Sequence, residues 1–291
     1  MRKEIEVKRI LNRSKHPSGW FGVVYNMNIY RGCQHGCIYC DSRSECYRIE
    51  NFDDITIKIN APKLLDKELR SKRKKGTIGT GSMSDPYIPL EKEYELTRQC
   101  LEIIGKFRFP VHITTKSNLI LRDIKILKKI NELYASVAIT ITTTDDILAK
   151  KIEPNAPLPS DRLEALSILS SVGIRTGIVM MPLLPYIQDS KDNIVKIVEK
   201  AKECGVGFIV PSFGMTLRDR QRAYYYKELD KHFPGLREKY ERKYKNYYSC
   251  GCNNYSLLKK VFYEKCLSNG IKTTMPSYSQ ENTMTQISFL R

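Results

Sequence analysis

The sequence has no apolar run long enough to cross a bilayer. Its first fifteen residues, MRKEIEVKRILNRSK, lack the apolar core of a secretory signal peptide. Low-complexity tracts are absent as well, so nothing indicates a disordered chain. These absences predict a folded cytoplasmic protein with no membrane partner. The 291 residues, 41% of them hydrophobic, can build one large domain or two small ones.

Acidic residues are few compared with basic ones, 32 against 49, and the formal net charge is +17. The excess is greatest in residues 63–75 and in residues 218–245, where basic residues alternate with tyrosines. Cations displace counterions from phosphates and aromatic rings stack on exposed bases, so this composition suits a nucleic acid. The alternative is an ordinary solvated surface in a basic protein.

The segment YRGCQHGCIYCDS, residues 30–42, lacks the fourth cysteine that a structural zinc or iron–sulfur site normally has. Its three cysteines are Cys33, Cys37 and Cys40. Three thiolates on a four-iron cluster leave one iron open to a substrate or cofactor. The spacing therefore favours an iron–sulfur cluster. The alternative is a zinc site completed by His35, Asp41 or Cys46.

Strand-like and helix-like segments alternate along the first 214 residues. The expected strands are residues 22–30, 76–83, 111–117, 136–144, 175–185 and 207–214, and the expected helices between the later strands are 93–107, 122–134, 160–173 and 190–205. This order predicts βαβ units and a parallel sheet. The expected fold is an α/β partial (β/α)6 TIM-type barrel over residues 1–214. A basic, tyrosine-rich, helical C-terminal extension, residues 215–291, would pack on it.

Polar residues lie where the expected strands end. They include Cys33, Ser84, Asp85, Lys116 and Thr142. In barrels of this kind the chemistry takes place at the carboxyl ends of the strands. The sequence therefore predicts an active site at that end of the barrel.

Cys-x3-Cys-x2-Cys with an aromatic residue, Tyr39, before the last cysteine resembles the signature of the radical S-adenosylmethionine (SAM) superfamily. Further blocks resemble the spore photoproduct lyase-like branch, often described as DNA repair photolyases. These blocks are GSMSDPYIPLEKEYELTRQCLEII, ITTKS, EPNAPLPSDRLEAL and GMTLRDRQR. The resemblance runs over about residues 25–266.

The resemblance implies one [4Fe–4S] cluster, SAM as co-substrate and an electron donor such as flavodoxin or ferredoxin. The implied reaction is hydrogen abstraction from a substrate, here expected to be a nucleic acid, by a 5′-deoxyadenosyl radical. Cys33, Cys37 and Cys40 would hold the cluster. The residues implied to contact SAM are Tyr39, Ser84, Lys116 and Thr140, with Thr142 as a rival to Thr140 because the facing of that strand is uncertain by one residue.

Two positions depart from the lyase itself. A cysteine that returns hydrogen to the product radical there is Ser82 here, and a tyrosine after the last cluster cysteine is Asp41. A hydroxyl is a much poorer hydrogen-atom donor than a thiol. The departures argue against repair of the spore photoproduct as the activity of this chain.

The remaining candidates lie in the extension. Arg218, Arg220 and Arg222 could meet phosphates, or could pair with nearby acids such as Asp219 and Glu228. A second set consists of Cys250, Cys252 and Cys266, which could hold a second cluster, perhaps with Cys204, donate hydrogen to a substrate radical, or be ordinary packed thiols.

Two other functions remain open on the sequence. One is a radical SAM enzyme that modifies a peptide or protein, which a second cluster near Cys250 would favour. The other is a non-catalytic zinc-dependent nucleic-acid-binding module, which would not bind SAM.

Overall fold

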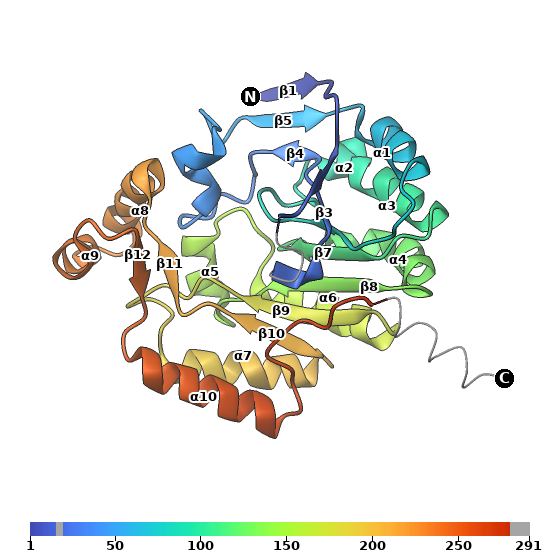
Figure 1. Ribbon diagram of the computed structural model, residues 1–291. Coiled ribbons are helices and arrows are strands. Elements are labelled where there is room, and N and C mark those ends of the chain that lie inside the picture. The colour runs from blue at the N-terminus through green and yellow to red at the C-terminus, as the bar shows by residue number, and fades with distance from the viewer. Residues whose placement is uncertain (16–19, 280–291) are drawn as a thin grey trace.

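The computed structural model describes residues 1–15 and 20–279 (Figure 1). Its main sheet has seven strands in the order β10-β9-β8-β7-β6-β3-β2. Their bounds are β2 (Leu11–Arg13), β3 (Tyr25–Met27), β6 (Ile78–Thr80), β7 (Val111–Thr115), β8 (Ala135–Thr140), β9 (Arg175–Met180) and β10 (Phe208–Pro211). The six strands from β3 to β10 are parallel, and β2 is antiparallel to β3. The predicted partial barrel of six parallel strands is therefore confirmed.

Helices follow the strands and cover the outside of the barrel (Figure 1). They are α1 (Ala61–Arg70), α2 (Glu91–Tyr94), α3 (Leu96–Lys106), α4 (Ile124–Asn131), α5 (Asp146–Ile152), α6 (Pro159–Ser171) and α7 (Lys191–Glu203). The expected helix 93–107 is interrupted at Glu95, whose φ of 50° is left-handed. The expected helix 122–134 begins as a 3-10 helix, η4 (Asn118–Asp123).

Helices α6 and α7 are capped in different ways. Ser190 accepts a hydrogen bond from the backbone of Asn193, as its N-cap position requires. Helix α6 begins instead at Pro159, and the Asp161 carboxylate accepts the backbone N–H of Leu158 at 3.2 Å. The Ser160 hydroxyl donates to Asp146, so it does not cap the helix.

The predicted strand 22–30 was wrong in extent. Its end is a separate strand, β4 (Tyr30–Arg31), which pairs with β5 (Ile55–Lys58) in a small sheet that β1 (Arg2–Ile5) completes. The alternation of buried and exposed residues stops at Ile29 and Tyr30, which are both buried. Tyr30 pairs with Ile57 and Arg31 with Thr56 of β5, so the chain has entered the second sheet at this point.

The two faces of β8 (Ala135–Thr140) pack into different cores. Val137 and Ile139 belong to the large core beneath the helices. Ala138 packs with Val179 and Phe208 in a separate, smaller core inside the barrel. Since side chains alternate along a strand, the even-numbered residues of β8 face the barrel interior.

The extension consists of β11 (Gly214–Thr216), α8 (Asp219–His232), α9 (Leu236–Tyr244), β12 (Ser249–Gly251) and α10 (Tyr255–Ser268). Helix α10 packs along α7, and β11 pairs with β12 (Figure 1). Beyond α10, Lys272 exchanges backbone hydrogen bonds with Gly207 and Ile209 at the edge of β10. The division into two domains at residue 214 stays a prediction.

No helix among the described residues is long and apolar enough to span a membrane.

Candidate active site

The cysteine loop leaves β4 and wraps back against the barrel. Gly32 has a φ of +84°, and a Cβ there would lie 2.7 Å from the Phe52 carbonyl oxygen, so only glycine fits. The Ser84 hydroxyl donates a hydrogen bond to the Gly32 carbonyl. The Ile38 N–H donates to the Ile152 carbonyl at 2.9 Å. Ser84 therefore supports the cysteine loop directly, beside any contact it makes with a ligand.

The donor set fits an iron–sulfur cluster. Burial raises the pKa of the Cys37 thiol to about 12, and it also raises the pKa of Cys33 and of Cys40. Thiolates are the form that binds metal, so a positive partner that lowers these values is expected. Lys116 provides it, because its charge acts to lower the pKa of Cys37 and of Cys40.

The three thiols do not converge on one ion. Among the described residues, no three His, Cys, Asp or Glu side chains are arranged to hold a single metal ion. A cluster needs no such point, because each cysteine binds a different iron atom.

The residues that would complete a zinc site have other partners. His35 lies 3.1 Å from the Asp85 carboxylate. Asp41 accepts hydrogen bonds from Thr216 and Tyr47, and the Cys46 sulfur accepts one from Ser44. The geometry around the loop does not support a zinc site.

Asp85 joins the cysteine loop to the end of β7. Its carboxylate accepts the Thr115 hydroxyl at 2.6 Å and the Lys116 N–H at 2.7 Å, besides its contact with His35. Burial alone would raise the pKa of this carboxyl, but His35 and the hydrogen bonds lower it to about 2. It also accepts the Tyr87 N–H at 2.8 Å, so Asp85 holds the turn around Pro86 as well.

Lys116, Tyr39, Glu153 and Arg162 form one buried group next to the thiols. Glu153 accepts the Tyr39 hydroxyl and lies 2.6 Å from Arg162 and 4.0 Å from the Lys116 ammonium. The same ammonium is 5.6 Å from the centre of the Tyr39 ring. Burial alone would lower the pKa of Lys116, but Cys37 and Glu153 raise it, so the side chain stays charged. Two cations face one carboxylate here, which leaves positive charge available for an anionic ligand.

Glu153 and Arg162 were missed as site residues by the sequence interpretation. Both lie in the block EPNAPLPSDRLEAL, which was used only to recognise the resemblance. Arg162 is 1% exposed and donates to the carbonyls of Thr140 and Pro157. A fully buried arginine needs several acceptors, but sequence alone does not indicate which arginine of a helix points inward.

Thr140 and Thr142 differ in their surroundings. Thr140, the last residue of β8, follows Ala138 on the inner face of the barrel. The Thr142 hydroxyl accepts a hydrogen bond from Gln188 at 2.7 Å. Thr140 is therefore the better placed of the two for a ligand inside the barrel, and its contact with SAM stays a prediction.

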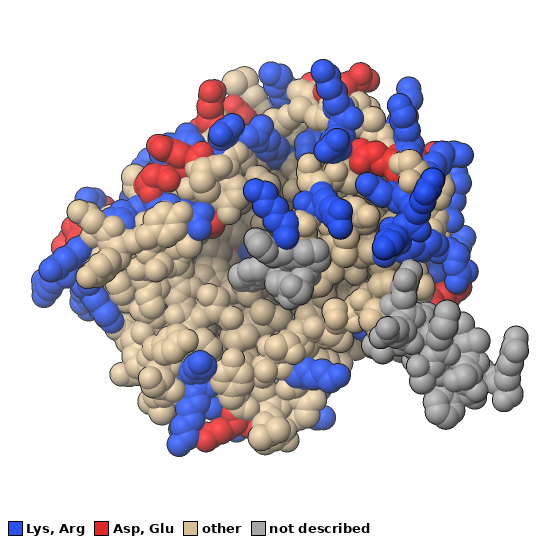
Figure 2. All heavy atoms as spheres, in the orientation of Figure 1, with Lys and Arg blue, Asp and Glu red and all other residues tan. Residues whose placement is uncertain are grey.

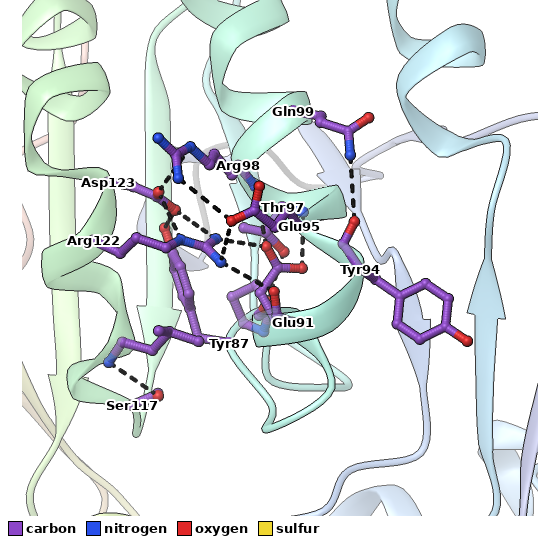
Figure 3. A network of polar contacts seen from close by, with 12 residues as sticks. Tyr87, Glu91, Tyr94, Glu95, Thr97, Arg98, Gln99, Ser117, Arg122 and Asp123 are labelled. Carbon is purple, nitrogen blue, oxygen red and sulfur yellow. Dashed lines mark hydrogen bonds and ion pairs between the residues drawn. The ribbon is translucent and has the colours of Figure 1, made fainter.

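A second polar network lies behind this site (Figure 3). Arg122 donates to Glu91 at 2.8 Å and to Asp123 at 3.0 Å, and both carboxylates are fully buried. Glu91 also accepts the Tyr30 hydroxyl, and Asp123 accepts the Tyr87 hydroxyl at 3.0 Å. The network thus fixes the strand before the cysteine loop to the segment that carries Ser84 and Asp85.

The three arginines after β11 all have partners within the protein. Arg218 lies 3.2 Å from Asp41, Arg220 donates to the carbonyls of residues 49 and 50, and Arg222 donates to the carbonyls of residues 217, 245 and 247. Contacts with nucleic-acid phosphates stay a prediction for these residues.

The cysteines of the extension are packed apart from one another. The Cys250 thiol faces the Met215 carbonyl, the Cys252 thiol faces the Leu183 carbonyl, and Cys266 lies in the core beneath α10. Burial raises the pKa of each to about 12. The Cys250 and Cys252 thiols thus lie against backbone carbonyls, and a second cluster at these cysteines stays a prediction.

The fold and the site together define an enzyme with a partial (β/α)6 barrel that holds an iron–sulfur cluster at the mouth of the barrel. The profile of the Radical SAM superfamily matches residues 27–198, and the chain belongs to this superfamily. The cofactors of the superfamily are a [4Fe–4S] cluster and SAM. Its members also use a reductant.

Solved structures of spore photoproduct lyase have the same fold. The complex with a dinucleoside spore photoproduct has a TM-score of 0.70 and 14% sequence identity, and covers 93% of this chain and 81% of the lyase chain. A variant of that lyase has been solved with bound SAM and the same dinucleoside; its TM-score is 0.69 at 14% identity, over 94% and 81% of the two chains.

Relatives in sequence include an uncharacterised protein of Methanocaldococcus jannaschii, 36% identical over 189 residues, or 64% of this chain and 69% of the relative. An uncharacterised protein of Mycobacterium tuberculosis is 27% identical over 76% of this chain and 67% of its own length. A radical SAM Nalpha-GlyT isomerase of Pseudomonas phage M6 is 24% identical over 62% of this chain and 37% of the isomerase.

Proposed function

We propose that this radical SAM enzyme abstracts a hydrogen atom from a nucleic-acid substrate and thereby repairs or modifies it. The observation that carries the choice of substrate is the charge of the extension. Residues 218–245 hold ten basic and five acidic residues, and Arg218 from this segment pairs with Asp41 next to the cluster cysteines. The spore photoproduct lyase of similar fold binds a dinucleoside, which supports the same class of substrate.

The chain's own residues have separable roles in this proposal. Cys33, Cys37 and Cys40 hold the cluster, and Lys116 pairs with the carboxylate of SAM. Ser84, Tyr39 and Thr140 complete the SAM site. When bound, the cluster and SAM supply a 5′-deoxyadenosyl radical that takes hydrogen from a substrate carbon. The barrel wall orients both ligands and excludes water.

The radical chemistry differs from that of spore photoproduct lyase in the return of hydrogen. Ser82 is exposed on the turn after β6, and Asp41 is held by Thr216, Tyr47 and Arg218. Neither can donate a hydrogen atom as a thiol or a phenol does. The proposed reaction ends in an isomerised or otherwise modified nucleotide; in an isomerisation the hydrogen atom would return to the product from 5′-deoxyadenosine. The phage isomerase among the relatives is an example of a radical SAM isomerase.

A peptide substrate is the weaker candidate. A second cluster in the extension would favour it, and the Cys250 and Cys252 thiols face backbone carbonyls instead. We infer a small acidic electron carrier such as flavodoxin or ferredoxin as the reductant.

The test is anaerobic reconstitution with iron and sulfide, followed by dithionite, SAM and defined substrates. Single-stranded DNA, single-stranded RNA, duplex DNA and a peptide pool are compared. Formation of 5′-deoxyadenosine that rises with one nucleic acid, with deuterium transfer from labelled nucleotides into it, supports the proposal. Stimulation by peptides alone contradicts it.

A further inference from the structure

Two adjacent tyrosines are exposed between α9 and β12. The side chains of Tyr247 and Tyr248 are 68% and 59% exposed, far more than the buried tyrosines of the same region, Tyr225, Tyr240 and Tyr244. Exposed aromatic side chains gain nothing from burial in the folded chain. A pair of them in one short loop indicates a surface that a partner covers.

The loop that carries these tyrosines is held rigidly by Arg222. Its guanidinium donates to the carbonyls of Lys245 at 2.9 Å, Tyr247 at 2.5 Å and Leu217 at 2.9 Å. The Leu217 N–H in turn donates to the Tyr248 carbonyl at 2.7 Å. The backbone of the two tyrosines is thus fixed to β11, so little backbone freedom would be lost when a ligand stacks on the rings.

The tyrosine pair lies on the cysteine-loop side of the extension. The Arg218 guanidinium packs over the Tyr248 ring, 4.7 Å from its centre, and pairs with Asp41 at 3.2 Å. Asp41 directly follows Cys40. A ligand that covers Tyr248 therefore lies beside the barrel mouth, where a longer chain can reach the active site.

Basic residues lie near the pair in the sequence. Arg242 and Lys245 are exposed close by in sequence, and Lys and Arg side chains gather over α9 at the left edge of the molecule (Figure 2). The Arg218 guanidinium covers one side of the Tyr248 ring, and both tyrosine side chains remain more than half exposed. Cations next to exposed rings are the combination that binds single strands: the cations follow the phosphates and the rings stack on unpaired bases. Bases in a duplex are already stacked on each other and do not offer these faces.

We propose that Tyr247 and Tyr248 form a stacking platform for the bases of a single-stranded nucleic acid, with Arg218, Arg242 and Lys245 beside its phosphates. The inference rests on the proposed function and adds the form of the substrate and the surface that receives it. In this proposal Arg222 is a positioning residue. Its guanidinium holds the loop, and Arg218, Arg242 and Lys245 contact the phosphates.

The test measures binding of a fluorescein-labelled single strand of ~12 nucleotides, a length that one such site can cover. Fluorescence anisotropy is recorded with the reconstituted enzyme for DNA and RNA strands and for the corresponding duplex. The Tyr247→Ala/Tyr248→Ala variant is expected to bind the single strand at least ~10-fold more weakly, since each stacked base contributes substantially. Tyr247→Phe/Tyr248→Phe keeps the rings and is expected to bind like the wild type.

The matched control is Tyr255→Ala/Tyr263→Ala, which removes two tyrosines of similar exposure, 48% and 42%, from α10. It is expected to bind the strand with unchanged affinity. Cleavage of SAM without substrate is measured in all variants and is expected to be unchanged, which shows that the site is intact.

The outcomes separate the two proposals. If the wild-type enzyme binds none of the nucleic acids, the proposed function fails and the platform fails with it. If it binds the single strand and the double-alanine variant binds equally well, only the platform is overturned. Tighter binding of the duplex than of the single strand by the wild type also overturns the platform while leaving the proposed function standing.

Discussion

The Tyr39 hydroxyl donates a hydrogen bond to the Glu153 carboxylate, although 114 residues separate them in sequence. One residue lies in the cysteine loop and the other follows α5. Through Glu153 the loop is connected to Arg162 and to the Lys116 ammonium. The Glu153 carboxylate thus connects the cysteine loop to the ammonium of the residue proposed to bind the SAM carboxylate.

This arrangement predicts that Glu153→Gln weakens SAM binding while the cluster is retained. The amide keeps the shape but loses the charge that positions Lys116, so we expect the dissociation constant of SAM to rise ~10-fold, which corresponds to about 1.4 kcal/mol. Equilibrium dialysis with labelled SAM measures it, and the iron and sulfide content reports the cluster. Glu132→Gln, at an exposed glutamate, is the control.

A double-mutant cycle tests whether Glu153 acts through Lys116. If it does, Lys116→Met/Glu153→Gln binds SAM no more weakly than Lys116→Met alone. Fully additive losses would show that Glu153 does not act through the lysine. If Glu153→Gln leaves the affinity for SAM unchanged and lowers the melting temperature, Glu153 has a structural role only.

The thiols give a second prediction. Cys33→Ala, Cys37→Ala and Cys40→Ala are each expected to lose most of the iron and all formation of 5′-deoxyadenosine, because each removes one thiolate of the cluster. Cys250→Ala and Cys252→Ala are expected to keep both, since these thiols face backbone carbonyls. The measurement is the iron content per chain of each variant. Loss of iron from the Cys250 variant would reopen the case for a second cluster.

Arg122 is expected to be essential for stability. Arg122→Met removes the cation that pairs with Glu91 and Asp123, both 0% exposed, and leaves Asp123 only the more distant Arg98. An uncompensated buried charge costs ~3–5 kcal/mol, so the free energy of unfolding should fall by about that amount. Urea denaturation of the wild type and the variant measures the difference. Arg98→Met is the control because Arg98 is half-exposed and lies 3.8 Å from Asp123; it should cost much less.

The burial of His112 predicts that the free energy of unfolding depends on pH. This side chain stacks on Phe21 with ring centres 4.7 Å apart, and its Nε2 contacts the Thr114 hydroxyl at 3.0 Å. Burial lowers the pKa of His112 from 6.5 to about 3. Below pH 6.5 the unfolded chain binds a proton that the folded chain does not, so stability falls as the pH falls toward 3.

The change between pH 7 and pH 5 should be about 2 kcal/mol for this group, from ~1.4 kcal/mol for each pH unit below 6.5. In His112→Asn this contribution disappears, so the loss of stability over that range should be smaller by the same amount. Urea denaturation at the two pH values measures it. His232→Asn, which leaves His112 in place, should retain the wild-type change. Equal changes in wild type and His112→Asn would show that His112 is protonated in the folded chain.

Much of the barrel could be predicted from the sequence because its elements are locally determined. Six apolar segments alternate with amphipathic ones, and the expected helix 190–205 forms as α7. The strand 22–30 could not be divided correctly, because the second sheet that receives β4 is built from β1 and β5, which are distant in sequence. Likewise the break at Glu95 depends on Glu91, whose carboxylate accepts the first N–H groups of α3.

The candidate site was predictable where a motif indicated it and not where burial decides it. The cysteines, Ser84 and Lys116 follow from the motifs and from their positions at strand ends. Glu153 and Arg162 could not be identified, because their role depends on contacts between a helix end, a helix interior and a loop more than one hundred residues away. The same holds for Arg222, for which the sequence left open phosphates or nearby acids as partners, and whose guanidinium holds a backbone loop.

The pairing of Lys272 with the edge of β10 has a consequence for the solubility of the protein. A partial barrel leaves an edge strand whose backbone groups can pair with another chain. The hydrogen bonds from Lys272 to Gly207 and from Ile209 to Lys272 occupy part of this edge. Anything that detaches this segment exposes a strand ready for intermolecular β-pairing, so the same few residues that complete the sheet also protect the enzyme from aggregation.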